Sequence, residues 1–172
     1  NLVSNVGVVA TDVTGVGSAR KQLAACEYGG DKGIFGYGST GVIVSMTNLV
    51  SNAGVVATDT TGVGTTRYIL SACGYGYDKG IFGYGANSSD AAVSMTNLVS
   101  NAGVVATDTT GVGTARFGLA SCEYGGDKGI FGYGTTGSNT AVTNLVSNAG
   151  VVATDVSGVG TARRYLAACS FN

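Results

Sequence analysis

Apolar and β-branched residues occur in short segments separated by glycine-marked breaks. In the first complete set, these segments cover residues 20–27, 32–37, 42–51 and 55–60. Their content of Val, Ile, Thr, Tyr and Phe is typical of β-strands. The most helix-like segment, residues 162–169, is too short for a stable helix and is bounded by glycine turns. The pattern therefore predicts an all-β protein.

Alternation within the second of these strands predicts how the strands pack. Successive side chains of a strand point to opposite faces, which places Phe35 and Tyr37 on one face and Ile34, Gly36 and Gly38 on the other. An aromatic face can pack closely against a glycine-rich face of a neighbouring sheet without leaving voids. We therefore expect sheets of the same kind to stack on one another.

The chain is an internal repeat. Asp-Lys-Gly-Ile-Phe-Gly-Tyr-Gly recurs without change at 31–38, 78–85 and 127–134. Division before each Asn-Leu-Val-Ser-Asn gives a single repeat domain, 1–172, with units at 1–47, 48–96, 97–143 and a partial unit at 144–172. Four strands in units of 47 to 49 residues match a propeller blade better than a helical solenoid. We expect a β-propeller of four-stranded antiparallel blades.

The stretch at 116–134, from Arg-Phe-Gly-Leu-Ala-Ser-Cys to Gly-Ile-Phe-Gly-Tyr-Gly, resembles the kelch motif. In that motif an inner strand led by arginine is followed by a second strand that ends in glycines. Here Gly-Tyr-Gly replaces the double glycine, and the tryptophan is missing. The resemblance implies a kelch-like propeller. Gly-Ile-Phe-Gly-Tyr-Gly is also similar to repeats of bacteriophage fibre and other surface proteins.

Composition narrows the function classes. The chain has 30 glycines, no proline, tryptophan or histidine, a net charge of −1 and a mean hydropathy of +0.28. Without an excess of Lys and Arg, nucleic acid is not expected as a partner. No apolar run approaches the roughly 18 residues of a membrane-spanning helix, so no membrane insertion is expected. A net charge near zero favours self-association.

The cysteines and the missing histidine argue against an enzyme or a metal protein. Cys26, Cys73, Cys122 and Cys169 occur once per unit, at positions that stacking holds farther apart than the roughly 7 Å between Cα atoms that a disulfide tolerates. We expect them to be small buried apolar residues. Neither a Cys-x-x-Cys pair nor a histidine is present for a zinc site, and a Ser or Cys nucleophile lacks its usual base. We expect no catalytic residues, no metal and no cofactor.

Charged residues recur in step with the repeat. Each Thr/Ser-Gly-Val-Gly turn separates an aspartate from an arginine eight residues later. We predict that these residues form salt bridges between adjacent blades, with arginines that bind an anionic ligand at a central channel as the alternative. The residues are Asp12, Arg20, Asp59, Arg67, Asp108, Arg116, Asp155 and Arg163.

The units differ mainly in the two residues after the arginine and in the loop after Gly-Tyr-Gly. In an up-and-down blade both regions lie on the same rim. Aromatic rings stack on the apolar faces of sugars while polar side chains bond to the hydroxyls, so we hypothesise a glycan-binding rim, with neutral drift of exposed loops as the alternative. Its candidate ligand-binding residues are Tyr68, Phe117, Tyr165, Asn87, Ser88, Asp90, Ser138 and Asn139.

These expectations combine into a non-enzymatic structural or adhesive repeat protein of a surface fibre, a virion or an extracellular assembly. The alternative is a lectin-like propeller that binds glycans through the variable rim. The partial unit leaves strand edges unpaired, and such edges invite pairing with another chain. We therefore expect a homo-oligomer, or a ring or filament completed by another chain, at an extracellular, virion or cell-surface location. The alternative is that four blades close within the chain and one of them is incomplete.

Overall fold

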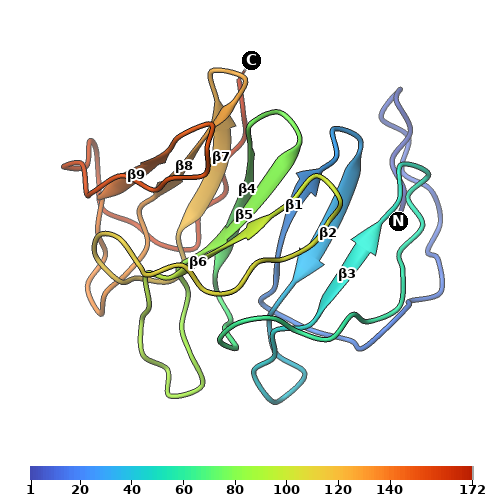
Figure 1. The fold of residues 1–172 in the computed structure, drawn as a ribbon, viewed down its shortest axis with the longest axis horizontal. Helices are drawn as coiled ribbons and strands as arrows, with labels where there is room; N and C mark the ends of the chain where they lie inside the picture. Colours follow the sequence, from blue (N-terminus) through green and yellow to red (C-terminus); the bar gives the residue numbers. More distant parts are fainter. Residues whose placement is uncertain (172) are drawn as a thin grey trace.

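The computed structural model describes residues 1–171, and the described chain consists of strands and loops without a helix. Three antiparallel sheets of three strands follow one another along the sequence (Figure 1). The all-β prediction is confirmed. The first sheet contains β1 (Ala24–Tyr28), β2 (Lys32–Gly36) and β3 (Thr47–Val50); the second contains β4 (Ser71–Tyr75), β5 (Lys79–Gly83) and β6 (Thr96–Val99); the third contains β7 (Ala120–Tyr124), β8 (Lys128–Gly132) and β9 (Thr143–Val146).

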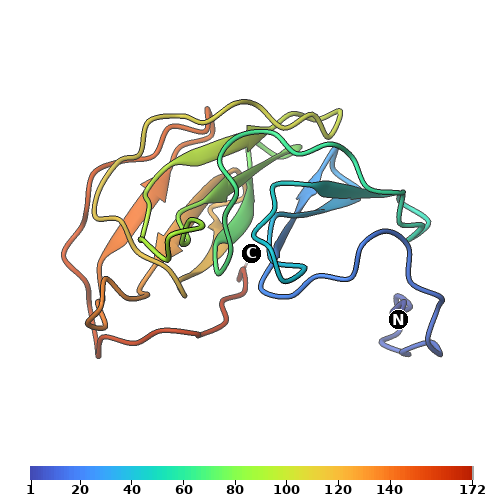
Figure 2. The same ribbon diagram turned by 90° about the horizontal axis from the view of Figure 1, so that it is seen from below.

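The sheets have three strands instead of the predicted four. The fourth segment, residues 55–60, meets β3 only at two isolated bridges, Thr47 with Thr60 and Val50 with Val56. Between these bridges the fourth segment has one residue more than β3, and an extra residue of this kind interrupts the hydrogen-bond ladder as a β-bulge. The three sheets lie side by side in an open arc, and within residues 1–171 they do not close into a propeller (Figure 2).

Neighbouring sheets pack through aromatic rings that sit on glycines. The ring of Phe82 lies against Gly36, and the ring of Phe131 lies against Gly83; at both glycines an added Cβ atom would lie 2.7 Å from the Cζ atom of the ring. Both rings are fully buried. The predicted packing of aromatic rings on glycine is confirmed, and it fixes the close spacing of the sheets.

The predicted grouping of Phe35 with Tyr37 on one face is wrong. Tyr37 follows β2 with a φ of +64°, a left-handed conformation that breaks the alternation of the strand. Its ring turns to the same side as Gly36 and packs edge-on against Phe82, with 5.2 Å between the ring centroids. Phe35 therefore faces away from the second sheet, whereas Tyr37 faces toward it.

Sheets and sequence units are out of phase. The first two strands of each sheet come from one copy of the repeat, and the third strand comes from the next copy. After the fourth segment, a Thr-Gly-Val-Gly linker crosses to the inner strand of the next sheet, so that β1 packs beside β4 and β4 beside β7.

The two ends of the stack differ. Residues 1–19 form an exposed arm whose hairpin is held by hydrogen bonds from Ala10 N to Leu2 O and from Ser4 N to Val8 O. Residues 157–171 form a tail that runs beside β7, where Tyr165 N donates to Gly118 O. The arm flanks the first sheet, whereas the tail begins beside the third sheet and runs back toward the middle of the arc (Figure 2).

Candidate functional site

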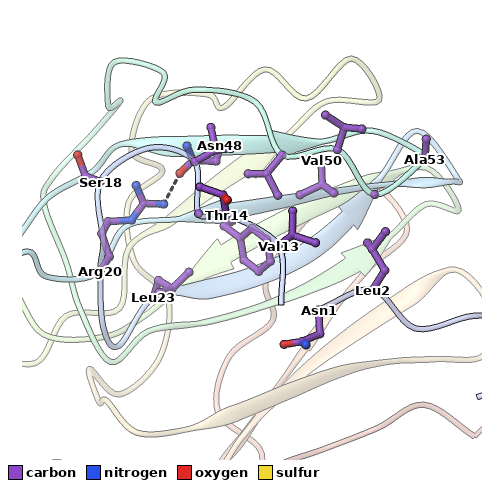
Figure 3. A pocket seen from close by; sticks show the side chains of 16 residues that line it. Asn1, Leu2, Val13, Thr14, Ser18, Arg20, Leu23, Asn48, Val50 and Ala53 are labelled. Atoms are coloured by element: carbon purple, nitrogen blue, oxygen red, sulfur yellow. Dashed lines mark hydrogen bonds between the residues drawn. The ribbon is translucent and has the colours of Figure 1, made fainter. Parts of the chain in front are cut away.

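The first sheet presents a face that no other sheet covers. Phe35 and Val50 of this face, with Leu23 just before β1, line a groove of about 600 Å³. Residues 1–2 and 13–16 of the arm close its other side (Figure 3). Phe35 is 38% exposed here, whereas its equivalents in the second and third sheets are 0% exposed. We call this surface the open face; it is an apolar sheet surface that elsewhere in the molecule is buried.

Polar side chains are arranged at one end of the groove. Arg20 donates from Nη2 to Asn48 Oδ1 at 2.5 Å (Figure 3), and its Nη1 lies 3.4 Å from Asp59 Oδ1. Asp59 also accepts hydrogen bonds from Asn48 Nδ2 at 2.9 Å and from the backbone N and Oγ of Ser18 at 2.9 and 2.7 Å. The bond from Asn48, followed by those from Ser18, holds the pKa of Asp59 below its usual range, which keeps the carboxylate charged.

Arg20 is incompletely satisfied. Its side chain is only 4% exposed, and its Nε atom makes no hydrogen bond within the described chain. A buried donor without a partner is costly, which makes the guanidinium a place where an additional contact would be favourable.

The interior of the stack shows what equivalent surfaces contact. The guanidinium of Arg67 lies over the ring of Tyr37, 4.6 Å from its centroid. The hydroxyl of the same tyrosine donates to Val63 O at 3.2 Å. Arg116, Tyr84 and Val112 repeat the arrangement between the second and third sheets.

We call this arrangement the tyrosine socket: an arginine and a valine carbonyl that together receive a tyrosine from the preceding sheet. At the open face, Arg20 and Val16 hold the corresponding positions and both line the groove. Within residues 1–171, no tyrosine ring stacks on the guanidinium of Arg20. The groove is therefore an unfilled tyrosine socket.

The aspartates and arginines predicted to bridge adjacent blades follow another pairing. Arg20 contacts Asp59, 39 residues away, and both residues belong to the first sheet and its flanking segments. Asp12 lies in the exposed arm. The reason is the phase shift, because the fourth segment beside each β3-type strand comes from the next copy of the repeat. Asp59 therefore anchors the linker that enters its own sheet, through Ser18.

The other members of the predicted pairs hold the later linkers. Asp108 accepts from Thr65 and Asn97, and Asp155 accepts from Thr114 and Asn144. Arg67 donates to Met95 O at 2.8 Å and Arg116 to Tyr133 O at 2.8 Å. Both arginines are fully buried, whereas Arg163 is exposed and lies 4.1 Å from the centroid of Tyr133.

The two variable regions of each unit meet, as the repeat pattern predicted. Backbone bridges join Tyr68 to Ala86 and Phe117 to Thr135. Tyr68 also donates from its hydroxyl to Asp90 Oδ1 at 2.6 Å, and this hydrogen bond raises the pKa of Tyr68. The loops that carry this variable rim project from the lower side of the molecule in Figure 1.

The remaining predicted rim residues have several environments. Asn87 uses its side-chain oxygen within its own loop, where it accepts the N–H groups of Ser89 and Ala91. Tyr165 is 62% exposed, while Phe117 is half-buried. Ser88, Asp90, Ser138 and Asn139 are exposed in these loops.

A pair of glutamates escaped the sequence analysis. The carboxylates of Glu27 and Glu123 both lie over Gly74. A Cβ atom added at this glycine would collide with Glu123 and would lie 3.0 Å from Glu27 Oε1. Burial, followed by hydrogen bonding to Glu27, raises the pKa of Glu123 to about 7. The signal in the sequence was the alternation of Glu, Gly and Glu at this position in successive units.

All four cysteines are free thiols, as predicted. Cys73 is buried against Gly129 of the next sheet, and burial raises the pKa of its thiol to about 12. Cys26 and Cys122 are half-buried, whereas Cys169 in the tail is exposed, contrary to the expectation of burial. Within residues 1–171, no three acidic or cysteine side chains are grouped so that they could hold a metal ion.

Comparison with known proteins gives no matching family model and no similar curated protein. The described chain also contains no helix of the length and apolarity needed to cross a membrane.

Proposed function

We propose that this chain is a non-enzymatic structural or adhesive repeat protein that assembles by stacking its sheets, as a component of a surface fibre, a virion or an extracellular assembly. One observation carries the proposal: the open face has the same residues as two surfaces that are buried between sheets inside the chain. Surfaces of this kind are apolar and shape-specific, and exposed apolar patches rimmed by polar residues mark interaction sites.

The polar residues of the groove support binding over catalysis. The carboxylate of Asp59 is already engaged by Arg20, Asn48 and Ser18. Its pKa is held below the usual range, which is unsuitable for a general base that works near neutral pH. The arrangement orients the arginine and holds the linker in place.

A kelch-like propeller is the architecture that we propose for the complete assembly. The fourth segment already approaches β3 through two bridges, as the outer strand of a blade would. The inner strands of successive sheets also lie side by side. Additional sheets, supplied by other copies, would extend the arc.

Sedimentation velocity tests assembly directly. Over a concentration range on the order of a hundredfold, the weight-average mass should rise from that of the 17.0 kDa chain as concentration increases. The association should persist at high salt, because the surface proposed to mediate it is mainly apolar. A single species of monomer mass throughout the range would refute the proposal.

Glycan binding at the variable rim is the second candidate. The hydrogen bond between Tyr68 and Asp90 holds the tyrosine ring in one orientation, and a fixed aromatic ring is suited to stack on a sugar. The double substitution Tyr68→Ala with Phe117→Ala should abolish saturable binding on a glycan array. Lys21→Ala, at the equivalent position of the first sheet, is the matched control and should leave binding unchanged. Equal glycan binding by the wild type and the double variant would exclude this candidate.

A further inference from the structure

We infer that the open face binds the third sheet of a second copy of this chain, head to tail, with the ring of Phe35 seated on Gly132. The inference rests on the proposed assembly function and names the partner and the contact surfaces. Inside the chain, each sheet is joined to the next by one repeated set of contacts. The two ends of the stack carry the unmatched halves of that set.

The first unmatched pair is a ring and a glycine. Phe82 fills the space over Gly36, and Phe131 fills the space over Gly83. Within residues 1–171, no glycine lies beneath Phe35. Gly132 has no ring above it, because an added Cβ atom there would meet only Thr143 Cγ2, at 3.5 Å.

The second unmatched pair is a thiol and a glycine. Cys26 Sγ would lie 2.5 Å from a Cβ atom added at Gly80 of the second sheet, and Cys73 Sγ would lie 2.8 Å from one added at Gly129 of the third. Cys122 of the third sheet has no further sheet to meet. Gly33, the equivalent glycine of the first sheet, has only residues of its own sheet nearby.

The third unmatched pair is a backbone hydrogen bond. Gly29 N donates to Asp78 O at 2.7 Å, and Gly76 N donates to Asp127 O at 2.8 Å, so each sheet donates to the next from the turn before its second strand. Among the described residues, the remaining donor is Gly125 N and the remaining acceptor is Asp31 O. In all three pairs, one half lies on the third sheet and the other on the first, so a single head-to-tail arrangement satisfies them together.

The tyrosine socket is completed by exchange. Tyr133 of the third sheet is covered by the tail, through the guanidinium of Arg163 and through Val159 O, which accepts its hydroxyl at 2.9 Å. Residues 14–28 repeat residues 157–171, with Gly-Val-Gly, Arg and Leu-Ala-Ala-Cys at the same positions. Arg20 of the second copy can therefore replace Arg163 over the ring of Tyr133, and Val16 O can replace Val159 O as the acceptor of its hydroxyl.

Exchange uncovers little apolar surface, because the elements that must move are already exposed to solvent. Every residue of the arm up to residue 19 is exposed, and the tail is exposed apart from Ala162 and Leu166. When residues 14–28 of the second copy take the place of the tail, Tyr133 keeps equivalent contacts. In addition, Phe35 of the second copy and Cys122 of the first become buried. The interface joins two different surfaces, so repeated docking forms a closed ring if the rotation between copies closes, and a filament if it does not.

Two substitutions at opposite ends test this arrangement. Phe35→Ser removes the ring, and Gly132→Val fills its seat; both lie at positions where an isolated chain has room for the change. Each variant alone should associate on the order of thirtyfold more weakly than the wild type. An equimolar mixture should form a dimer and nothing larger, because Phe35 of the Gly132→Val chain can still dock on Gly132 of the Phe35→Ser chain.

Control measurements separate assembly from folding. Circular dichroism and thermal unfolding of each variant at low concentration should match the wild type. Val42→Ser removes another exposed apolar residue, 73% exposed and outside the open face, and should leave association unchanged.

The outcomes distinguish this inference from the proposed function. A wild-type chain that associates while both variants associate equally well overturns the docking arrangement and leaves the assembly function intact. Variants that are each monomeric but form no dimer when mixed overturn the head-to-tail geometry. A wild-type chain that stays monomeric overturns both proposals.

Discussion

Two equivalent glycines should respond in opposite ways to the same substitution. In Gly83→Ala, the new methyl group would lie 2.7 Å from Phe131 Cζ and 3.1 to 3.2 Å from two further ring atoms. The ring cannot retreat easily, because it is fully buried and packs edge-on against Tyr84. In Gly132→Ala, the methyl group would meet only Thr143, at an ordinary contact distance of 3.5 Å.

The magnitudes follow from two effects of opposite sign. Forcing a methyl group into a packed core costs ~1–3 kcal/mol of the free energy of unfolding. Replacing glycine by alanine where φ permits it also restricts the unfolded chain, which stabilises by ~0.4–1 kcal/mol. We expect a net loss of about 1–2 kcal/mol for Gly83→Ala, and a change between zero and a gain of about 1 kcal/mol for Gly132→Ala.

Urea unfolding followed by circular dichroism measures this difference, at a concentration low enough for the chain to be monomeric. The thermal midpoint of Gly83→Ala should fall by about 2–8 °C, given the size of the chain. Gly36→Ala, which faces Phe82 in the same way, should behave like Gly83→Ala. If Gly83→Ala were as stable as the wild type, or if Gly132→Ala lost as much, ring-on-glycine packing would not control the spacing of the sheets.

Three further predictions concern charges and thiols. Folding raises the pKa of Glu123 from the ordinary 4.5 to about 7, so the folded state binds more protons and the free energy of unfolding should fall as pH rises from about 5 to about 8. Glu123→Gln should reduce this fall by ~1 kcal/mol, a value discounted for solvent screening. Urea midpoints that are the same at both pH values would contradict this prediction. Asp108→Ala should lower the free energy of urea unfolding by ~2–4 kcal/mol, because hydrogen bonds to the linker are lost and the buried Arg67 loses a nearby compensating charge. Asp12→Ala, in the exposed arm, should change it by less than ~0.5 kcal/mol. Similar losses in both variants would show that the aspartates do not hold the linkers. Alkylation of the native chain near pH 8, followed by peptide mass spectrometry, should label Cys169 well before the buried Cys73. Equal labelling rates for the two cysteines would show that the thiol of Cys169 is covered by the rest of the tail.

Local pattern was sufficient to predict an all-β chain and the packing of rings on glycines, but not the number of strands in each sheet. The β2-type strands and the glycines opposite the phenylalanines follow from strand composition and from alternation. The loss of the predicted fourth strand could not be foreseen, because the pairing of this segment is interrupted by one extra residue opposite β3. The side chain of Asn48 donates to Ala57 O and to Asp59 across this interruption. The orientation of Tyr37 also escaped alternation, since non-glycine residues seldom adopt a positive φ.

The site was less accessible from the sequence, for a different physical reason. Phe35 and Phe82 lie in identical local sequences, yet one is partly exposed and the other fully buried, because exposure depends on whether another sheet follows in space. The partner of Arg20 depends on which copy supplies the adjacent fourth segment. The variable rim was predictable, because differences between repeated units mark positions that the shared packing does not constrain.

The phase shift between sheets and sequence units bears on how such an array can grow. Because each sheet combines strands from two successive copies, a tandem duplication of about one repeat length can begin at any residue and still add one complete sheet and one complete set of contacts. The copies are 47 or 49 residues apart, and the two additional residues lie in the loop at 86–95, outside the packed strands. Unequal recombination within the gene would therefore change the length of the stack in whole steps, without requiring a breakpoint at a unit boundary.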